Sequence, residues 1–458
     1  MTSPEADIAD QAGHISFVPA SESGSPDGLD RVQAISNNSS AWQGACMGHA
    51  EPDVVIVGTG IAGGALGTVL ARSGFEVVLL ERENNYPDRV RGEFLAPWGV
   101  TELAKLELMQ PLREAGALFT RRNVPYDEIF APAEAEARAL DLTKMHAEGL
   151  GGLCLGHPAT CGEFAQLATT SGASVLRGAG AISVASGSRP IVNCTHDGAS
   201  LEFRPRLVIG ADGRNSSVRK DLGFRVNADE PRNLLGGMLV KGVPSWPRDM
   251  QVIGVEDRFH FLVFPQGDDL LRLYGSYHFA DKSRFDGPDR RAKLIDAFGK
   301  LTCLPYAEAI AASTPIGPFN SFSNEDHWID DPTCPGIVLI GDAAGHNDPI
   351  LGQGLSIALR DVRLVSEILG GAKAAGREPD FRPYVEERAE RMRRLRITAR
   401  VATTLRVEFG SEARERRARV GKRVAAGQLA PLLASLIGPE RLPAEAFLPE
   451  TVEKLLAS

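Results

Sequence analysis

The sequence predicts an α/β protein of the two-domain α+β kind, with a Rossmann-like dinucleotide-binding domain, an inserted mixed β-sheet domain and C-terminal helices. Three observations lead to this fold class. The apolar run Val54 to Val57 ends at a Gly-x-Gly-x-x-Gly motif, as a buried parallel strand does before a phosphate-binding turn. Between about residues 234 and 278, strand-like runs broken by Pro and Gly occur at Leu234 to Val240, Phe259 to Phe264 and Leu270 to His278. A short apolar strand at Ile337 to Ile340 then returns the chain to the first domain.

The first motif is Gly58-Thr-Gly60-Ile-Ala-Gly63, and each glycine has a physical role. Gly58 makes the tight turn, Gly60 lets the backbone touch a pyrophosphate, and Gly63 allows close contact between helix and strand. A helix from about Ile61 to Ser73 points its N-terminal amides at the phosphates, and Gly74 ends it with a left-handed cap. An ordinary βαβ turn that binds no ligand is the alternative interpretation.

An acidic residue marks the nucleotide end of the predicted site. Residues Phe75 to Leu80 form the second predicted strand, and Glu81 follows it where a carboxylate can accept both ribose hydroxyls. Arg82 is a further candidate contact beside it. A carboxylate here disfavours a 2′-phosphorylated nucleotide, because two anions would repel each other. The pocket therefore suits an adenosine with free hydroxyls.

The second motif, Asp212-Gly213, makes a turn after a predicted strand from Leu207 to Gly210. Ser216 or Ser217 then caps a short helix. Taken alone, this motif is also typical of a capped βα turn without a ligand. In its place between the other two motifs, it predicts a contact with the middle of a long cofactor.

The third motif begins at Asp342, which ends a buried strand where a carboxylate needs a partner such as a polyol chain. A helix from about Leu355 to Leu369 follows, and its free N-terminal amides favour the electron-rich N1 and O2 edge of a reduced flavin. The three ordered motifs therefore predict FAD as the cofactor. The predicted ring contacts are Pro349, Gly352, Gln353 and Gly354.

The amino-acid composition narrows the classes of function and location that fit this chain. The 458 residues carry a formal net charge of −9, which gives no overall field for nucleic acid. The six cysteines include no C-x-x-C pair, so we expect free thiols and a cytoplasmic location. No uncharged apolar stretch reaches the roughly 18 residues of a membrane span, and no metal cluster is expected among the nine histidines. The oligomeric state stays open.

The predicted domain boundaries follow changes in composition along the chain. A helical stretch is expected from Gly99 to about Gly116, and Asp197-Gly198 marks a hairpin. Between Arg382 and Arg423, fourteen basic and six acidic residues favour solvated helix faces over a partner or membrane patch. The predicted parts are a disordered extension at 1–52, an FAD-binding domain at 53–233 and 331–380, a substrate-binding β-sheet domain at 234–330, and a C-terminal helical region at 381–458.

Beyond the three motifs, the chain resembles the para-hydroxybenzoate-hydroxylase-like, single-component FAD-dependent monooxygenases (group A flavoprotein monooxygenases). The segment Arg91-Gly-Glu-Phe-Leu-Ala-Pro is similar to the family stretch whose arginine lies near the flavin. Arg272-Leu-Tyr274 resembles the strand that passes the flavin and lines the substrate cavity. Two positions depart from the pattern. Cys161 stands where the family often has an arginine, and His346 stands later than the histidine that often follows Ala-Ala.

This resemblance implies an activity. Hydride from transiently bound NADH or NADPH would reduce FAD, and oxygen would add to form a flavin C4a-hydroperoxide that hydroxylates or epoxidises a small organic substrate, aromatic or otherwise a secondary metabolite. A flavin-dependent reductase of the isoprenoid-reductase kind is the main alternative. A flavin halogenase and a non-redox nucleotide-binding escort protein are further alternatives.

The catalytic candidates come from the second sheet. Period-two alternation puts Arg272 and Tyr274 on one face of a strand, and His260 on the corresponding face of its neighbour. Arg272 is expected beside the flavin, and Tyr274 is expected to bond a substrate hydroxyl. The alternative is that these side chains only pack in a half-buried sheet.

Overall fold

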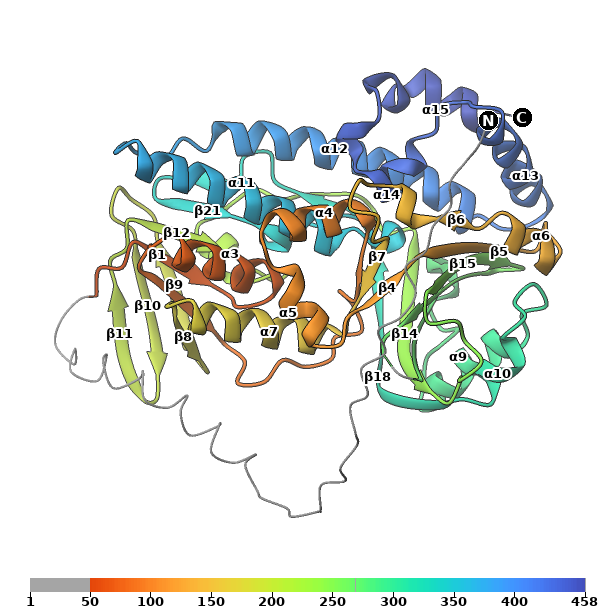
Figure 1. Ribbon diagram of the computed structural model, residues 1–458, viewed down its shortest axis with the longest axis horizontal. Coiled ribbons are helices and arrows are strands. Elements are labelled where there is room, and N and C mark those ends of the chain that lie inside the picture. The colour runs from red at the N-terminus through yellow and green to blue at the C-terminus, as the bar shows by residue number, and fades with distance from the viewer. Residues whose placement is uncertain (1–49, 268, 458) are drawn as a thin grey trace, which may run out of the picture. The chain divides into compact units, whose positions relative to one another are not determined.

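The computed structural model describes residues 50–267 and 269–457. The predicted disordered extension, residues 1–52, therefore lies outside the described residues except for its last three. Within the described part, the strands form a six-stranded sheet, a seven-stranded sheet, two three-stranded sheets and a two-stranded sheet. Figure 1 shows the two large sheets next to each other, with helices on both.

The six-stranded sheet carries the three predicted cofactor motifs. Neighbouring strands are parallel, except for the antiparallel pair at one edge. The two central strands that were predicted are buried along their whole length, which explains their apolar sequences. In spatial order the strands are β20 (Thr333–Cys334), β21 (Ile337–Leu339), β12 (Leu207–Gly210), β1 (Val54–Val57), β2 (Val77–Glu81) and β8 (Ser174–Arg177).

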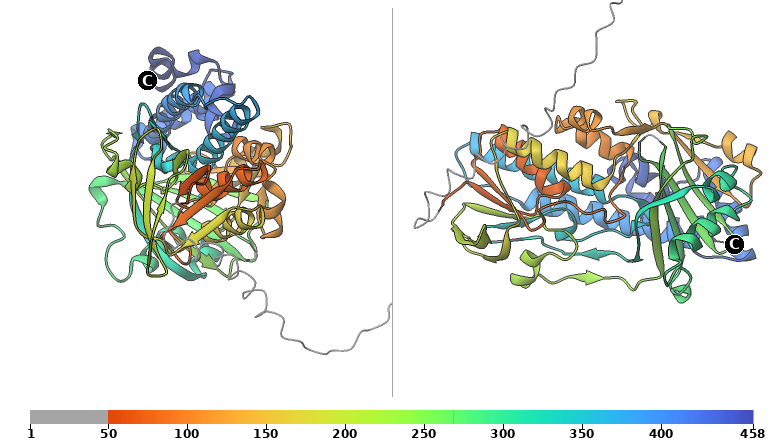
Figure 2. Two further views of the ribbon diagram at one scale, coloured as in Figure 1. Left: turned by 90° about the vertical axis from the view of Figure 1, so that its left-hand side faces the viewer. Right: turned by 90° about the horizontal axis from the view of Figure 1, so that it is seen from below.

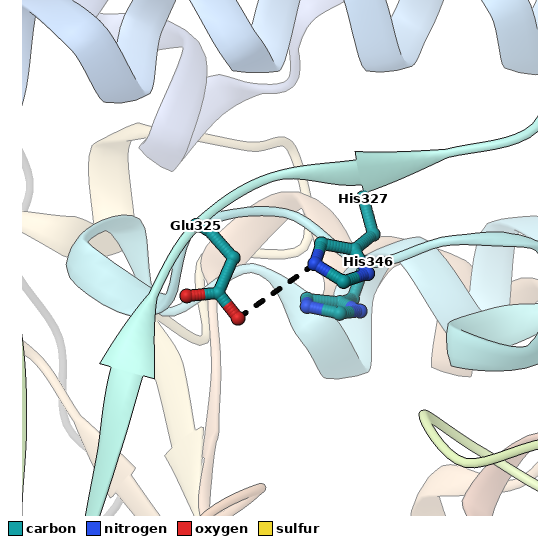
Figure 3. Close-up of side chains that lie close together, drawn as sticks. All are labelled: Glu325, His327 and His346. Carbon is teal, nitrogen blue, oxygen red and sulfur yellow. Dashed lines mark ion pairs between the residues drawn. The ribbon is translucent and has the colours of Figure 1, made fainter. Parts of the chain in front are cut away.

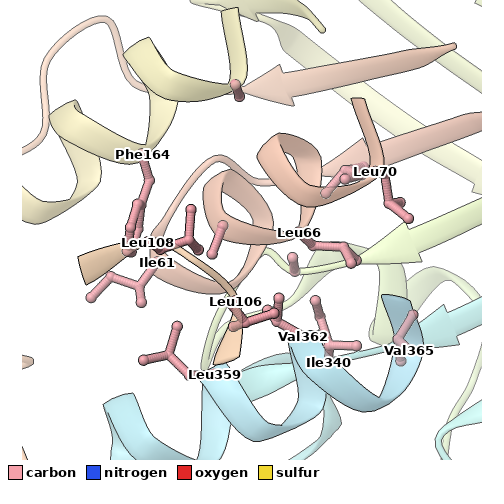
Figure 4. Packing of buried hydrophobic residues seen from close by; sticks show 14 of the residues in the cluster. Ile61, Leu66, Leu70, Leu106, Leu108, Phe164, Ile340, Leu359, Val362 and Val365 are labelled. Atoms are coloured by element: carbon pink, nitrogen blue, oxygen red, sulfur yellow. The ribbon is translucent and has the colours of Figure 1, made fainter. Parts of the chain in front are cut away.

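Helices cover one face of this sheet around an aliphatic core, shown in Figure 4. The first of them packs closely because its glycines leave room. A Cβ at Gly64 would lie 2.8 Å from the Phe164 Cβ, and one at Gly67 would lie 2.7 Å from a Leu79 methyl group. The helices are α3 (Ile61–Arg72), α4 (Pro97–Lys105), α5 (Met109–Glu114), α7 (His157–Thr170) and α11 (Gly354–Ala374).

Two predictions about these helices have different outcomes. Gly74 has φ +73° directly after α3, so it provides the predicted left-handed cap. The helical stretch predicted from Gly99 to Gly116 is instead two helices, α4 and α5. Glu107 has φ +57° between them, and this backbone conformation cannot continue an α-helix.

The seven-stranded sheet is antiparallel apart from one parallel pair, β15 with β5. Its strand β17 covers the run predicted from Leu270 to His278. Strands β5 and β6 precede residue 234, so the second sheet also recruits chain that was predicted to belong to the first domain. In spatial order the strands are β18 (Thr314–Asn324), β14 (Asn233–Lys241), β17 (Leu270–His278), β16 (Phe259–Pro265), β15 (Met250–Glu256), β5 (Arg122–Asp127) and β6 (Leu140–Asp141).

The two faces of this sheet have different neighbours. One face carries Phe259, Phe261 and Val263, which pack with Leu294 and Phe298 of a short helix into a separate apolar core. The opposite face borders the cavity that lies between the two large sheets. The helices on the core side are α9 (Arg290–Gly299) and α10 (Ala307–Ala311).

Short elements complete the framework. The predicted Asp197-Gly198 turn joins two strands with both residues at positive φ, as a tight hairpin requires. The remaining strands are β3 (Phe94–Leu95), β4 (Leu118–Thr120), β7 (Gly152–Cys154), β9 (Gly180–Ala185), β10 (Ile191–His196), β11 (Ala199–Phe203), β13 (Asn227–Ala228) and β19 (His327–Trp328). The remaining short helices are α6 (Pro132–Ala137) and α8 (Ser217–Asp221).

The C-terminal helices are α12 (Arg382–Arg406), α13 (Ser411–Ala425), α14 (Ala434–Ile437) and α15 (Pro449–Leu456). Figure 1 and the left view of Figure 2 place these blue helices on one side of the green strands of the seven-stranded sheet. None of the described helices combines the length and the apolar character that a membrane span needs.

Buried ion pairs attach the C-terminal helices to the rest of the protein. Asp361 of α11 accepts from Arg388 Nε at 3.1 Å and from Arg391 Nη2 at 2.6 Å. Arg417 of α13 pairs with Asp127 of β5, with 2.9 Å between Nε and Oδ2. The interpretation of the basic stretch as solvated helix faces is wrong for these three arginines, because their side chains are buried.

Candidate cofactor and substrate site

A cavity of about 810 Å³ lies where the two large sheets meet. It is bordered by the carboxyl ends of β1, β2 and β12, which is the edge at which open parallel sheets bind ligands. One face of β15, β16 and β17 forms another wall. The predicted site residues that line the cavity are Gly58, Gly60, Glu81, Arg82, Arg91, Asp212, Gly213, Tyr274, Asp342, Pro349, Gly352, Gln353 and Gly354. Gly63, Arg272 and His260 do not line it.

The glycines of the first motif have distinct surroundings. A Cβ at Gly63 would lie 1.9 Å from the Gly58 carbonyl oxygen, and a Cβ at Gly58 would lie 2.6 Å from the Ala211 carbonyl oxygen. Gly60 has open space on its Cβ side and borders the cavity. No side chain caps α3, so its first amides are available to an anion. This arrangement fits a pyrophosphate at Gly60.

Glu81 and Arg82 differ in how firmly they are held. Glu81 is buried, and its carboxylate accepts from Thr59 N at 2.8 Å and from Glu83 N at 2.9 Å. These bonds hold the carboxylate at the cavity edge with lone pairs left for ribose hydroxyls. The Arg82 side chain is 76% exposed and pairs with Glu83, so its contact with a cofactor stays a prediction.

The second motif has a structural role that the sequence did not reveal. Asp212 Oδ2 accepts from Ser217 N at 2.6 Å and from Val218 N at 3.2 Å, so this carboxylate caps α8. Ser216 is the N-cap residue, as one of the two predicted alternatives. Asp212 and Gly213 still border the cavity, and their contact with the cofactor stays a prediction.

Asp342 lies among cations. Arg214 Nε donates to its carboxylate at 3.3 Å. Burial raises the pKa of Asp342, but Arg214, His346 and Arg91 outweigh burial, so the pKa lies below its ordinary value. Asp342 is therefore a charged acceptor at the cavity wall. Burial and the neighbouring Arg214 lower the pKa of Arg91, which also lines the cavity.

The ring-end loop, residues 349–353, is held by Trp98 and by the Gln353 side chain of the third motif itself. Gly352 has φ +65°, and the helix α11 begins two residues later. Trp98 Nε1 donates to the Gln353 side-chain oxygen at 2.7 Å, and Gln353 Nε2 donates to Leu351 O at 2.6 Å. The Gln353 side chain therefore fixes the loop. No side chain caps α11, so its first backbone amides remain available to the ring.

A buried network connects the second sheet with the segment that follows Arg91. The Tyr274 hydroxyl donates to Glu93 Oε2 at 2.6 Å. Arg272 Nη2 lies 2.6 Å from Glu93 Oε1 and 2.9 Å from Asp88 Oδ2. Burial raises the pKa of Glu93, and Arg272 and Tyr274 oppose that rise. Arg272 thus lies behind the cavity wall and holds Glu93, while Tyr274 faces the cavity.

Glu93 is a candidate functional residue that the sequence analysis did not single out. It is 2% exposed and borders the cavity. A signal was present, since the chain places this acid within the segment Arg91-Gly-Glu-Phe-Leu that was singled out for its arginine. A carboxylate among apolar residues is rarely buried without a partner.

His260 lies on the expected face of β16 but is fully buried, and neither ring nitrogen has a hydrogen-bond partner among the described residues. Burial, and then Arg406 and Arg417, lower its pKa well below the ordinary value. His260 is thus a neutral ring beneath the C-terminal helices. Its catalytic role stays a prediction that this placement does not favour.

One of the two departures from the family pattern, Cys161, lines the cavity. Cys161 is buried, and burial raises the pKa of its thiol to about 12. His157 also lines the cavity, next to Cys161 on α7, and burial with Arg89 and Arg91 lowers its pKa to about 4. Neither side chain supplies the positive charge of an arginine.

Figure 3 shows a cluster of Glu325, His327 and His346. One ligand atom from each lies within 4.8 Å of the others. The two imidazole rings are stacked, with centroids 4.4 Å apart and planes 28° apart. Imidazole lone pairs lie in the ring plane, so stacked rings do not aim them at a common point. This geometry supports ring packing rather than metal coordination.

The fold and the cavity define the class of the protein. A glycine-rich strand–turn–helix, a ribose-end carboxylate and an uncapped helix at the ring end fit FAD, and a second sheet faces the same space. A family model described as an FAD binding domain matches residues 51–398, so the chain belongs to this FAD binding domain family.

Relatives with known activities point to the same class. The 6-methylpretetramide 4-monooxygenase of Streptomyces rimosus is 25% identical over an alignment of 401 residues, and the match covers 78% of this chain and 87% of that protein. Squalene epoxidase 3 of Arabidopsis thaliana is 23% identical over 341 residues. These are 73% of this chain but only 63% of the epoxidase, so the chain spans less than two thirds of that relative.

Among solved structures, p-nitrophenol 4-monooxygenase PnpA from Pseudomonas putida DLL-E4 has a TM-score of 0.71 at 18% identity. The match covers 86% of this chain and 100% of that chain, and it shows the shared fold. Together with the family, these comparisons confirm the resemblance to single-component FAD-dependent monooxygenases and confirm FAD as the cofactor.

Proposed function

We propose that the protein is an FAD-dependent, NAD(P)H-consuming monooxygenase that hydroxylates or epoxidises a small organic substrate. One observation carries this proposal. A single cavity borders the three cofactor motifs and also the Tyr274–Glu93 pair of the second sheet. A flavin ring and a substrate can therefore share one cavity, which brings them close enough for oxygen transfer.

The chain's own residues divide the work of binding. When bound, FAD would accept a hydride from NADH or NADPH and would activate O₂. Gly60 and the first turn of α3 would hold the pyrophosphate, Glu81 the ribose, and the first turn of α11 the anionic edge of the ring. These roles follow from the donors and acceptors that each residue presents to the cavity.

Tyr274 and Glu93 are the proposed proton-handling pair. A substrate hydroxyl beside Tyr274 can give its proton to the tyrosine oxygen while the tyrosine gives its own proton to Glu93. Deprotonation makes an aromatic ring more electron-rich, which favours attack on an electrophilic oxygen. Arg272 is a positioning residue, because it holds Glu93 without facing the cavity.

The cavity wall favours an unsaturated, largely apolar substrate. Phe94 and Phe264 stack with ring centroids 5.0 Å apart, and Leu235 and Leu262 continue this wall. Such a wall keeps water away from the reacting oxygen and offers flat contact surface. The activity of one relative by sequence, the 6-methylpretetramide 4-monooxygenase, supports an aromatic substrate. An aromatic or other unsaturated secondary metabolite is the proposed class.

The cytoplasm remains the proposed location. The five cysteines that the structure describes are free thiols, which suits a reducing compartment. The proposed partners are the small-molecule substrate, O₂ and the nicotinamide donor.

Oxygen incorporation tests the proposed function. FAD-loaded protein is supplied with NADH or NADPH, isotopically labelled O₂ and a panel of phenols, polycyclic aromatics and polyenes. We expect one compound to accelerate NAD(P)H oxidation and to gain one labelled oxygen atom. Oxidation of NAD(P)H with reduction of a substrate double bond and no label in the product would favour the reductase. A protein that takes up no FAD would refute both.

A further inference from the structure

Arg406 brings a positive charge from the C-terminal helices to the cavity. It is the last residue of α12, and it lines the cavity. Its Nη1 donates to the carbonyl oxygen of Ile350 at 3.3 Å. Ile350 belongs to the short turn that precedes Gly352 of the ring-end loop. The Arg406 guanidinium therefore lies next to the loop that would hold the flavin ring.

Arg406 has no carboxylate partner among the described residues. The buried arginines Arg272, Arg388, Arg391 and Arg417 each pair with an Asp or Glu. For Arg406, burial alone lowers the pKa, to about 10, and no neighbouring acid raises it. A guanidinium has five N–H donors, and the Ile350 carbonyl takes one of them. The remaining N–H donors of Arg406 can therefore bind acceptors in the cavity, which this residue lines.

The surroundings of Arg406 suit an anion within an apolar molecule. His260, which also lies under the C-terminal helices, is neutral and adds no negative charge. The C-terminal segments supply a mostly aliphatic wall to the same cavity, so the cation is little screened by water. The apolar wall residues are Val424, Ala430, Leu432, Leu433 and Leu436.

Arg91 provides a useful contrast. It also lines the cavity, but it lies close enough to Asp342 and Arg214 for their charges to shift its pKa, and it belongs to the proposed cofactor end. Arg406 comes from the C-terminal helices and contacts Ile350, which lies eight residues after Asp342 in the third motif. The two arginines therefore serve different parts of the cavity.

We propose that Arg406 binds an anionic oxygen of the substrate, a carboxylate or an ionised phenol or enol on an otherwise apolar molecule. This inference rests on the proposed function and narrows its substrate class. An unpaired, partly desolvated guanidinium gains most from a charge-assisted, bidentate contact. Because the same guanidinium contacts Ile350, the bound acid would also be held in a fixed place relative to the ring-end loop.

Two probes of equal shape and different charge test this binding. Isothermal titration calorimetry measures 2-naphthoate and 2-naphthamide binding to the FAD-supplemented protein near pH 8, where a carboxylate is ionised. The variants are Arg406→Gln, Arg406→Lys and the control Arg393→Gln. Arg393 lies on the same helix, is exposed and pairs with Glu390. Circular dichroism and FAD content verify that each variant folds.

We expect wild-type protein and Arg393→Gln to bind the acid roughly tenfold or more tightly than the amide. Arg406→Gln should abolish this preference with amide binding retained, and Arg406→Lys should keep part of it. No preference in the wild type, no binding of either probe, or a preference that survives Arg406→Gln would overturn the inference. Calorimetry requires no turnover, so this outcome is independent of oxygen incorporation, on which the proposed function depends.

Discussion

Tyr274 and Tyr277 lie on opposite faces of the same strand, β17, and both are buried. The Tyr274 hydroxyl reaches Glu93 on the cavity side, whereas the Tyr277 hydroxyl lies 3.0 Å from Ser321 Oγ. They form a matched pair for testing proton handling at the scale of a single hydroxyl group.

We predict that Tyr274→Phe lowers kcat roughly 100-fold on a hydroxylated aromatic substrate while FAD content stays at the wild-type level. The variant keeps the ring and the Arg272–Glu93 contact, so the loss reports on the hydroxyl. Tyr277→Phe should leave kcat close to wild type. Steady-state kinetics measure both. Wild-type kcat in Tyr274→Phe would rule out the proposed proton transfer.

Asp348 gives a residue-scale prediction about pH. Burial raises its pKa from 3.8 to about 7; the Ile350 amide opposes this and Asp326 adds to it. The folded state thus keeps a proton that the unfolded chain releases. The free energy of unfolding therefore falls as pH rises from about 4 to about 7, by at most roughly 4 kcal/mol.

Asp348→Asn removes this titration. We expect its melting temperature to fall less between pH 5 and pH 8 than that of the wild type, by calorimetry at about those two values. Asp380→Asn is the control, because Asp380 is exposed and the adjacent Arg382 lowers its pKa to about 2. An unchanged pH dependence in Asp348→Asn would show that the carboxyl is already ionised near pH 5.

At the scale of one element, the turn before α3 contains one glycine that is needed for packing and another that faces the proposed binding site. Gly63 touches the Gly58 carbonyl, and Gly60 faces open cavity with φ −66°, which any residue can adopt. Two substitutions of the same size, at the N-cap Gly60 and at the third residue of α3, Gly63, should therefore have different consequences.

We predict that Gly60→Ala weakens FAD binding about tenfold or more with little change in the apoprotein melting temperature. Gly63→Ala should lower both, because its Cβ would lie 1.9 Å from a carbonyl oxygen. FAD titration by flavin fluorescence and thermal unfolding of the apoprotein give the two readouts. Equal effects of both variants on the apoprotein would contradict the proposed open cradle at Gly60.

For the whole molecule, the C-terminal helices contribute to the cavity wall, and Arg417 attaches them to the seven-stranded sheet. It pairs with Asp127 and with Glu128, and it is 8% exposed. Removing one partner of a buried ion pair typically costs about 3–5 kcal/mol, because the other charge stays buried. Burial already raises the pKa of Asp127, so its ionised form would be costly without Arg417.

We predict that Arg417→Met speeds hydrogen exchange of residues 411–425 and raises the fraction of NAD(P)H oxidation that ends in hydrogen peroxide instead of product. Water would reach the reacting oxygen more easily. Lys422→Met, on the exposed face of the same helix, serves as the control. Faster exchange with unchanged peroxide yield would mean that α13 does not seal the cavity.

The first βαβ unit was predictable because its information is local. Strand, glycine turn, helix, cap and acid follow one another within about thirty residues, so period and turn chemistry suffice. Strand β17 was also visible as a continuous run. Strands β15 and β18 were not predicted, because their Gln, Gly, Pro and Ser residues weaken the alternating pattern and only their neighbours in the sheet define them.

The candidate site divides in the same way. Most of the residues that the motifs predicted do border the cavity, since a dinucleotide requires particular backbone positions. The roles of Glu93 and Arg272 depended on partners far away in the chain, whereas Asp212 accepts from backbone amides only five and six residues away. Asp212 caps a helix, and Arg272 holds Glu93 from behind the wall. Residue type alone does not tell a catalytic side chain from a supporting one.

By itself, the sequence determined that this protein has an FAD-binding α/β domain with an inserted second sheet, because those features depend on neighbouring residues and on backbone chemistry. Only the tertiary structure decided which charged groups are paired. Arg388 and Arg417 of the basic stretch lie in internal ion pairs, while Arg406 is left facing the cavity. The physical reason is that a charge inside a protein is defined by the groups that surround it, and those come from distant parts of the chain.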